Sequence, residues 1–310
     1  MDIKKIAIIG SNGFIGSNLA KKLKTISDTK IYLFGRSETS TLGNDFLYTQ
    51  INISDTQQVL HHFRDIDFIY FLASETIPAT SWDKPTIEIT NNLLPFVTFI
   101  ETISTLNIKR VVFVSSAGTI YGPTDLKVDE DSVKKPFSPY GITKLAMEYY
   151  LNYFHHKHGL LYDVYRVSNV YGEGQNISKG LGIINTFLEK ILIDHKIQIF
   201  GDGSNVRNYI YIQDLVTLMC YSINSGLETS NIFNASSNDT LSINQLVAII
   251  KKVVDQEFAV EYMPTRSSDN STIFLDNSRL LNKNPDFKFT DIQEGIRSTY
   301  ELIKSRMHFK

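Results

Sequence analysis

Tyr140 and Lys144 stand four positions apart in a segment whose pattern predicts a helix, and together they could transfer a proton. Residues i and i+4 lie on one helix face, so the phenol and the ammonium can reach the same point. A nearby lysine cation, together with an oxidised nicotinamide, would favour the phenolate and lower the pKa of Tyr140 toward neutrality. The pair is therefore a candidate general base or acid. A Tyr-x-x-x-Lys pair also arises by chance among 16 tyrosines, so its meaning depends on the surrounding fold.

A glycine-rich turn near the N-terminus could bind a phosphate group. Gly10, Gly13 and Gly16 follow the apolar run 6–9 and open an amphipathic segment, which predicts a strand, a tight turn and a helix. Without a Cβ the chain can turn sharply and approach a pyrophosphate, which then sits at the positive helix N-terminus. A glycine turn with no ligand is the competing interpretation, because the pattern alone is weak.

Apolar runs and helical patterns alternate through the first half of the chain. Near-continuous apolar strands separated by helices indicate a parallel sheet covered on both faces, so we expect an α/β, Rossmann-type doubly wound fold. In such sheets ligands bind beyond the carboxyl ends of the strands. The expected strands are 6–9, 31–34, 68–72, 111–114 and 162–166, and the expected helices are 14–25, 55–64, 86–107 and 140–158.

The pattern changes after residue 172, where shorter elements mix with loops rich in Gly, Asn and Ser. We expect a dinucleotide-binding domain over 1–172, with 206–234 returning to it. A smaller, mixed α/β, substrate-binding lobe is expected mainly from 173–205 and 235–310.

The composition of the chain argues against several other classes of function. With 310 residues, 42% of them apolar, the chain can bury a large core, and a net charge of −2 leaves no basic footprint for nucleic acid. No secretory signal opens the chain and no apolar run approaches 18 residues, so we expect a cytoplasmic protein without a membrane span. The single Cys220 excludes an internal disulfide and is expected to be buried in a helix. His155, His156 and His158 read as a solvated helix end, and no metal site is expected.

Longer motifs connect these residues to a known family. They are VSSAGTIYG at 114–122, RVSNVYG at 166–172 and GDGSNVRNYIYIQDL at 201–215. With the glycine turn and the Tyr140–Lys144 pair, they resemble the extended short-chain dehydrogenase/reductase superfamily, in its nucleotide-sugar epimerase/dehydratase group. The likeness covers residues 3–302 and is strongest to UDP-hexose 4-epimerases.

The resemblance implies a redox cycle that regenerates its own cofactor. Tyr140 would take the proton from the sugar 4-hydroxyl while hydride passes to a bound nicotinamide. Lys144 would hold the nicotinamide ribose. The 4-keto sugar would then turn over and receive hydride on its other face. The cofactor contacts implied are Gly10, Asn12, Gly13, Phe14, Ile15, Gly16, Arg36, Asn52, Ile53, Leu72, Ala73, Ser74 and Asn92, besides Tyr140 and Lys144.

Ala117 departs from the family pattern. In galactose epimerases a hydroxyl residue that assists the tyrosine usually lies four positions before the tyrosine of the Tyr-Gly motif, and Ala117 holds that position here. Ser116 is the first candidate to supply the hydroxyl and Thr119 the second, unless both only cap the strand end. The triplet 117–119 has no carboxylate, which argues against the resemblance to 4,6-dehydratases.

The end of the second strand normally decides between NAD and NADP. An acidic side chain there binds the ribose 2′-hydroxyl, whereas an arginine can accommodate a 2′-phosphate. Gly35 stands where the epimerases generally have Asp, and Arg36 follows it, with Glu38 close by. Arg36 could bind a phosphate or stack on adenine. The resemblance favours NAD, and Gly35-Arg36 leaves NADP open.

On the substrate side the resemblance implies an anion clamp. Arg207 and Arg266 match the arginines that hold the nucleotide diphosphate, Asn169 would add a hydrogen bond to it, and Ser116 would contact the sugar. Ile273 stands near the position that sets the size of the sugar pocket. Its intermediate size does not decide which sugar the pocket accepts. The uridine pocket would use backbone around 197–200.

The expected partners are a UDP-sugar, or a related nucleotide sugar, and a second copy of the chain. Family members usually dimerise through a four-helix bundle, here the helices near 86–107 and 140–158. The main alternative is an NADP-dependent reductase of a nucleotide-linked 4-keto sugar, for which Gly35-Arg36 argues. A non-catalytic nucleotide-binding regulator is a third reading; Ala117 alone supports it, and the intact Tyr140 and Lys144 argue against it.

Overall fold

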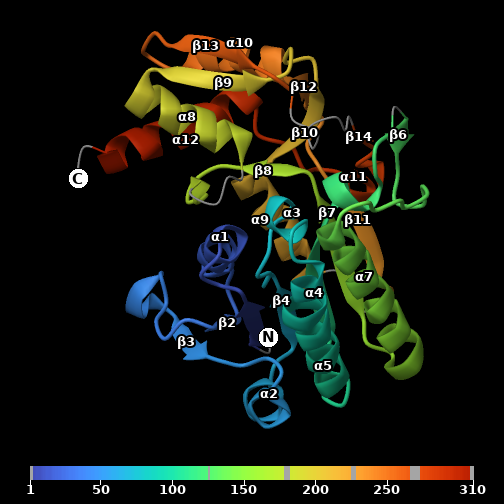
Figure 1. The fold of residues 1–310 in the computed structure, drawn as a ribbon. Coiled ribbons are helices and arrows are strands. Elements are labelled where there is room, and N and C mark those ends of the chain that lie inside the picture. Colours follow the sequence, from blue (N-terminus) through green and yellow to red (C-terminus); the bar gives the residue numbers. More distant parts are fainter. Residues whose placement is uncertain (1–2, 125, 178–181, 225–227, 266–272, 308–310) are drawn as a thin grey trace. The chain divides into compact units, whose positions relative to one another are not determined.

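The computed structural model groups the chain into two compact units (Figure 1). The first contains Met1–Ile120, Lys134–Arg166 and Val216–Phe233, and the second contains Tyr121–Val133, Val167–Leu215 and Asn234–Lys310. This division differs from the expected boundaries, because 121–133, 167–172 and 206–215 group with the second unit. The structure describes residues 3–124, 126–177, 182–224, 228–265 and 273–307.

The centre of the first unit is a seven-stranded sheet in the order β11-β7-β5-β4-β1-β2-β3. Its central pairs are parallel, and Ile9 lies between Phe34 and Phe71 on the neighbouring strands. The expected doubly wound α/β fold is confirmed. The strands are β1 (Lys4–Ile9), β2 (Thr29–Gly35), β3 (Leu47–Gln50), β4 (Phe68–Phe71), β5 (Arg110–Ser116), β7 (Tyr162–Val167) and β11 (Asn231–Ala235).

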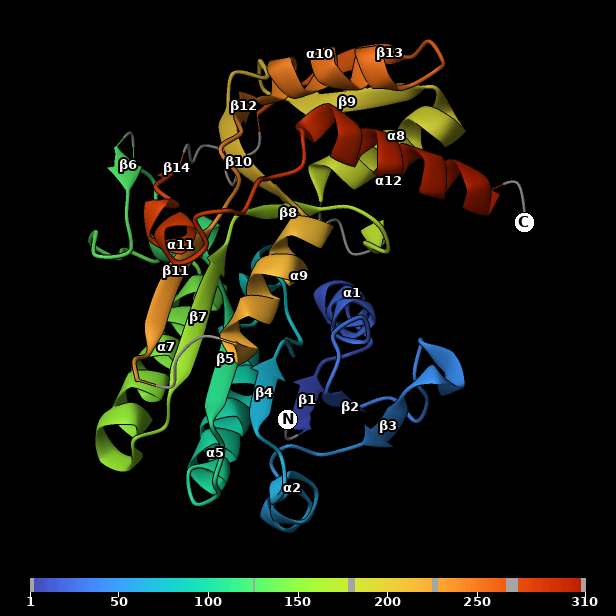
Figure 2. The same ribbon diagram turned by 180° about the vertical axis from the view of Figure 1, so that it is seen from behind.

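Helices cover both faces of this sheet (Figures 1 and 2). On one face lie α2 (Thr56–Phe63), α5 (Leu94–Ile103) and α7 (Pro139–His158), packed through a phenylalanine-rich cluster in which the Phe63 ring lies 4.7 Å from Phe34 and 5.2 Å from Phe99. The other face meets α1 (Phe14–Leu23) and the end of α9 (Ile212–Cys220), where the Tyr70 hydroxyl donates to the Met219 carbonyl. Short helices in this unit are α3 (Pro78–Ser81), α4 (Pro85–Ile87), α6 (Ala117–Ile120) and the single turns Gly43–Asp45 and Tyr221–Ile223.

The helix expected over 86–107 is interrupted. Between α4 and α5 lies a π-helical segment, η2 (Glu88–Leu93). The helix expected over 140–158 is continuous: Pro139 is its first residue and Gly159 ends it with a φ of 72°. The Ser138 side chain caps its start by accepting a hydrogen bond from the Gly141 backbone.

The second unit is the expected mixed α/β structure. Strand β10 pairs antiparallel with β12 and parallel with β8, while β9 pairs with β13 and β6 with β14, both parallel. Helix α12 packs against α8 and α10. The elements are β6 (Lys127–Val128), β8 (Asn169–Tyr171), α8 (Ile183–Asp194), β9 (Lys196–Phe200), β10 (Val206–Tyr211), β12 (Thr240–Ser242), α10 (Ile243–Val253), β13 (Ala259–Met263), β14 (Phe274–Leu275), α11 (Ser278–Lys283) and α12 (Ile292–Met307).

Within the described residues, none of the helices is long and apolar enough to cross a membrane.

Candidate active site

The glycine turn joins the ends of β1 and β4. Gly10 has a φ of 86°, and a Cβ at this position would lie 2.7 Å from the Ala73 backbone nitrogen. A Cβ on Gly16 would lie 2.4 Å from the Gly10 carbonyl oxygen, so the first turn of α1 can pack on the loop only because Gly16 has no side chain. The turn therefore brings the predicted cofactor residues at 10–16 next to Leu72 and Ala73.

The N-terminus of α1 suits an anion. Gly13 is its N-cap and offers no side chain to the first backbone N–H groups, and Phe14 and Ile15 form the first turn. These N–H groups are directed outward along the helix axis and carry its positive end. A close backbone approach at this helix start is the arrangement that a pyrophosphate requires.

Asn12 contacts a neighbouring loop. Its Nδ2 donates to the Thr39 carbonyl at 2.9 Å and its Oδ1 accepts from the Thr41 backbone at 3.0 Å. The predicted cofactor residue thus also anchors the segment that follows β2.

The Tyr48 side chain lies where a side chain at the end of β2 would begin. A Cβ on Gly35 would lie 2.8 Å from the Tyr48 hydroxyl, which donates to the Ser37 carbonyl at 2.7 Å. Arg36 is exposed and forms an ion pair with Glu75 at 2.9 Å. The Arg36 guanidinium thus already has a carboxylate partner, which sequence analysis did not foresee.

Asn52 and Ile53 follow β3 at the same edge of the sheet. The Asn52 side chain accepts a hydrogen bond from the Ser54 backbone at 3.1 Å, and Ile53 packs on the phenylalanine-rich core. Their backbone is thus fixed immediately before α2.

Tyr140 and Lys144 lie at the start of α7. The Lys144 ammonium donates to the Val114 carbonyl on β5 at 3.1 Å and lies 5.6 Å from the centre of the Tyr140 ring. Lys144 is 5% exposed, and burial lowers its pKa to about 8, although the Glu88 and Glu148 carboxylates oppose this shift. The predicted pair is therefore assembled, with its lysine fixed to the sheet.

In the protein without a nicotinamide, the surroundings of Tyr140 act against the phenolate. Burial raises the pKa of Tyr140 well above its ordinary value, and the charge of Glu88 raises it further, while a hydrogen bond with Ser74 acts in the opposite direction. Removing the phenol from water penalises the phenolate more than the hydrogen bond with Ser74 favours it.

Three hydroxyl side chains stand near the end of β5. Ser116 ends the strand and is half-buried, and the Oγ atoms of Ser115 and Thr119 are buried without a hydrogen-bond partner among the described residues. A Cβ on Gly141 would lie 2.4 Å from the Thr119 carbonyl oxygen, so the first turn of α7 packs directly on Thr119. Ala117, between them, is fully buried.

The Asn92 side chain forms hydrogen bonds within the protein. Its Oδ1 accepts from the Glu75 backbone at 2.9 Å, and its Nδ2 donates to Thr76 at 3.0 Å and to Glu88 at 3.1 Å. Asn92 is 7% exposed, so its side chain holds the loop after β4, which includes Ser74, from the interior of the protein. Sequence analysis missed Glu88, because it lies among polar residues of the helix predicted over 86–107 and belongs to no recognised motif.

Arg166 holds α7 against the sheet. Its guanidinium lies 2.7 Å from Glu148 on α7, and both side chains are almost completely buried. The motif arginine at 166 thus fixes the helix that carries Tyr140.

The predicted substrate residues that are described lie on adjacent strands of the second unit. Asn169 on β8 pairs in register with Tyr209, two residues beyond Arg207 on β10. The Asn169 amide donates to the Asn208 carbonyl, and Arg207 donates to the Val206 carbonyl, both at 2.9 Å. Arg266 lies outside the described residues. Ile273 is buried, and the stretch 197–200 belongs to β9.

Residues 6–236 match the model of the NAD dependent epimerase/dehydratase family. The chain belongs to this family.

Proteins similar to this family member include enzymes of two kinds. A UDP-glucose 4-epimerase of Mycolicibacterium smegmatis is 29% identical over 314 residues, which cover 96% of this chain and 98% of that protein. A dTDP-4-dehydro-6-deoxyglucose reductase of Escherichia coli is also 29% identical, over 91% of this chain and 92% of that protein. Among solved structures, the UDP-glucose 4-epimerase of Thermotoga maritima with UDP-glucose has a TM-score of 0.89 and 27% identity, covering 98% of this chain and 99% of that one.

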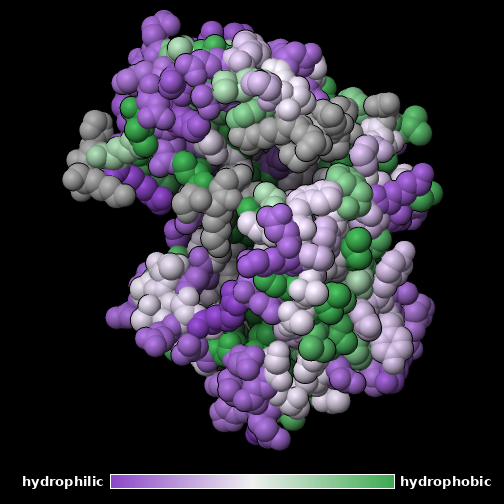
Figure 3. All heavy atoms as spheres, in the orientation of Figure 1, coloured by the Kyte–Doolittle hydropathy of each residue, from purple (hydrophilic) through white to green (hydrophobic). Residues whose placement is uncertain are grey.

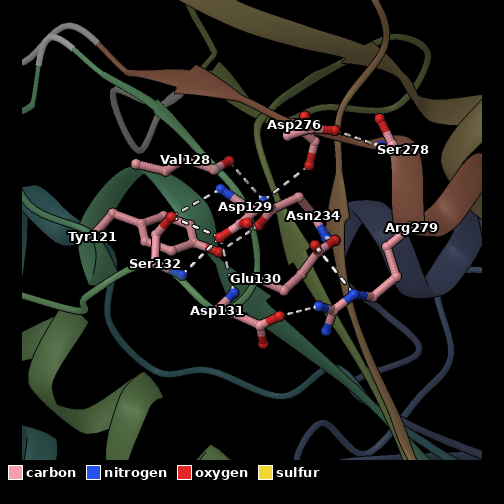
Figure 4. Close-up of polar contacts among 10 residues, drawn as sticks. All are labelled: Tyr121, Val128, Asp129, Glu130, Asp131, Ser132, Asn234, Asp276, Ser278 and Arg279. Atoms are coloured by element: carbon pink, nitrogen blue, oxygen red, sulfur yellow. Dashed lines mark hydrogen bonds and ion pairs between the residues drawn. The ribbon is translucent and has the colours of Figure 1, made fainter.

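In this family member the tyrosine of the Tyr-Gly motif is structural (Figure 4). The Tyr121 hydroxyl lies 2.6 Å from the Asn234 side chain, whose amide donates to the Val128 and Asp276 carbonyls. The Asn234 backbone donates to Glu130, which Arg279 also contacts at 3.4 Å. The network connects the segment 127–132 to the end of β11 and to α11. The Tyr121 hydroxyl is engaged in it as a hydrogen-bond donor to Asn234.

Cys220 is buried at the end of α9, as expected. Burial raises the pKa of its thiol to about 12. The thiolate is therefore strongly disfavoured at neutral pH, which argues for a structural residue.

Proposed function

We propose that the protein is an NAD-dependent nucleotide-sugar 4-epimerase that inverts the 4-hydroxyl of a UDP-hexose or UDP-N-acetylhexosamine through a transient 4-keto sugar. The observation that carries the proposal is the pairing of Tyr140 and Lys144 at the carboxyl end of β5, in the same unit as the glycine turn. The family and the names of the similar epimerases support it.

The residues at the sheet edge fit a dinucleotide. Gly10 and Gly16 let backbone segments approach more closely than any side chain would permit, and the start of α1 has no side-chain cap. We assign the pyrophosphate to the turn at 10–16, the adenine side to Asn52, Ile53 and Arg36, and the nicotinamide ribose to Lys144. NAD, when bound, accepts a hydride from the sugar C4 and returns it.

The protein's own part in the chemistry is proton transfer. Tyr140 would accept the proton of the 4-hydroxyl in the first half-reaction and donate it back in the second. Lys144, fixed on Val114, would stabilise the phenolate, and Ser74 would hydrogen-bond it. Asn169, Arg207 and Arg266 would bind the diphosphate of the substrate, because guanidinium groups match phosphate oxygens.

A proton NMR time course tests the proposal. Purified protein is incubated with UDP-glucose or with UDP-N-acetylglucosamine, and no nicotinamide is added. We expect the galacto epimer to form from one of them, since the redox cycle regenerates its cofactor. The absence of any epimer, even after NAD is supplied, would overturn the proposal for these two sugars and favour the reductase described next.

A second candidate is an NADP-dependent reductase of a nucleotide-linked 4-keto sugar. The missing acidic group at Gly35, the Tyr48 hydroxyl in its place and the adjacent Arg36 favour it, as does the similar E. coli reductase. The two functions differ in stoichiometry, because the reductase consumes one NADPH per product and the epimerase consumes none. Absorbance at the reduced-nicotinamide band, followed with a 4-keto substrate, distinguishes them.

Replacing Thr119 with alanine should reduce kcat more than replacing Ser116. Thr119 is supported as the assisting hydroxyl because its Oγ is buried and unpartnered and its backbone contacts Gly141, next to the catalytic tyrosine. Losing one hydrogen bond to a developing charge costs on the order of 10²-fold in kcat. We expect about that loss for Thr119→Ala, less than tenfold for Ser116→Ala, and recovery in Thr119→Ser. The reverse order would return the assignment to Ser116.

We further propose that the protein dimerises through α7 and the helices before it. Ile142, Tyr149 and Tyr153 are about half exposed or more, and their spacing of seven and four residues places them on one face of α7. Ile89 and Leu94 are likewise exposed on η2 and α5, and apolar surface is visible over these helices in Figure 3. A second copy, packed face to face, would cover this surface.

Tyr149→Lys should convert the protein to a monomer in light scattering after size-exclusion chromatography. A buried, unpaired ammonium at the centre of an apolar interface opposes association. Tyr262→Lys is the matched control, because Tyr262 is equally exposed but lies on β13 of the second unit. A wild-type protein that is already monomeric would exclude the interface.

A further inference from the structure

Glu88 is a buried carboxylate with an unsatisfied oxygen. The residue is 1% exposed; its Oε2 accepts the hydrogen bond from Asn92, and its Oε1 has no hydrogen-bond partner within the described part of the chain. Two other buried acidic residues of the same unit have arginine partners: Glu148 pairs with Arg166, and Asp163 with Arg110. Burying a carboxylate without such a partner costs several kcal/mol, so a compensating role is expected.

The local backbone positions Glu88 toward the catalytic helix. Glu88 is the first residue of the π-helical segment η2, and π-helical turns are rare and often occur at functional sites. Segment η2 packs against α7, which carries Tyr140 and Lys144. Asn92 connects the Glu88 carboxylate to Thr76 and to the Glu75 backbone, in the loop that also contains Ser74. Glu88 is therefore buried in the segment that packs against the helix carrying the proton-transfer pair.

The charges around the pair are few. Glu88 from η2 and Glu148 from α7 both act on Lys144, and Glu148 is already neutralised by Arg166. Glu88 is the charge that acts on Tyr140, where it opposes the phenolate. Burial of Lys144 favours the neutral amine, so an unpaired carboxylate nearby is what keeps this lysine protonated.

We propose that Glu88 is a positioning residue of this site that acts through Lys144: its unpaired carboxylate keeps the buried lysine ammonium charged at neutral pH and keeps the Tyr140 phenol protonated in the resting site. The proposal rests on the proposed proton-transfer role of this pair. The resting site then holds a charged lysine and a protonated phenol, and this phenol must lose its proton before Tyr140 can accept the proton of the 4-hydroxyl. The substrate and cofactor charges that enter later would shift this balance.

The test is an NMR titration of lysine side chains labelled with ¹³C at Cε, performed on the full chain without substrate. The signal of Lys144, identified by its loss in Lys144→Met, should titrate near pH 8, well apart from exposed lysines. In Glu88→Gln, which keeps the volume and the acceptor for Asn92, we expect this midpoint to fall by about one pH unit. Glu88→Asp should restore it, and Glu101→Gln, an equal charge change at an exposed site on α5, should leave it unchanged.

Thermal unfolding of the same variants separates this role from a structural one. Removing an unpaired buried charge should not lower the Tm of Glu88→Gln, and the midpoint of Lys144 should still move. An unshifted midpoint, with or without a lower Tm, would overturn the proposal. Because no substrate is used, this result is independent of whether the protein proves to be an epimerase.

Discussion

Tyr140→Phe should lose on the order of 10³-fold or more in kcat while the fold and the bound cofactor are retained. The phenol is the only described proton-transfer group that lies both on the first turn of α7 and beside a fixed lysine ammonium. General acid–base catalysis contributes typically 10² to 10⁴-fold, and here one group serves both half-reactions. Phenylalanine keeps the ring and removes only the hydroxyl. The rate is measured by NMR with the sugar that the wild-type protein converts.

Tyr221→Phe is the matched control for this variant. Tyr221 loses the same hydroxyl in the same unit, but it is 42% exposed and lies outside the proposed site. Its rate and Tm should equal those of the wild-type protein. If Tyr140→Phe remained as active as this control, proton transfer would have to be assigned to another group, and the non-catalytic nucleotide-binding regulator would regain support.

The parts of the fold that sequence predicted are those governed by local periodicity. The five predicted strands are central ones, buried on both faces and therefore continuous apolar runs. The two missed strands, β3 and β11, are the edges of the sheet, and β3 (LYTQ) has no buried residue at all. β3 faces solvent and needs no apolar run, so its pattern resembles that of a loop; β11 has three buried residues, but polar Asn residues interrupt its sequence NIFNA.

The helix predicted over 86–107 shows a second limit of prediction from periodicity. Its apolar positions predicted a helix correctly, but the pattern could not reveal one π-helical segment within it. In that segment Asn92 donates a hydrogen bond to Glu88, four residues before it, a contact that the pattern could not reveal. Asn92 proved to support a loop, and Glu88 was not foreseen.

Electrostatics was the least predictable property of the site. A lysine four residues after a tyrosine gave no sign that burial raises the phenol pKa in the protein without cofactor, because burial depends on residues distant in sequence. Long-range ion pairs were invisible for the same reason. Arg36 meets Glu75, 39 positions later, and Arg110 meets Asp163, 53 positions later. Motif positions constrained by backbone space, such as Gly10 and Gly16, were predictable from the sequence because only glycine fits them.

Gly16→Ala should abolish the retention of NAD and lower the Tm by several degrees. The added methyl group would lie 2.4 Å from the Gly10 carbonyl oxygen and 2.9 Å from the Ser11 Cα, and both atoms belong to the backbone. Relief requires that α1 move away from the end of β1, which separates the helix N-terminus from the turn that faces the pyrophosphate. Overpacking of this kind costs about 1–3 kcal/mol. Cofactor content is measured from the absorbance of the purified protein after acid release, and Tm by calorimetry.

The glycines of this unit provide a graded series for the same experiment. A Cβ at Gly13 would lie 3.2 Å from the Gly10 carbonyl oxygen, whereas a Cβ at Gly118 would meet nothing within 4 Å. Gly118→Ala should therefore keep both its bound NAD and its Tm, Gly13→Ala should lose part of the NAD, and Gly16→Ala should lose all of it. Since all three changes add the same methyl group, an effect that follows the distance to Gly10 identifies the packed turn as the cause. Equal NAD retention in Gly16→Ala and Gly118→Ala would remove the turn at 10–16 from the cofactor site.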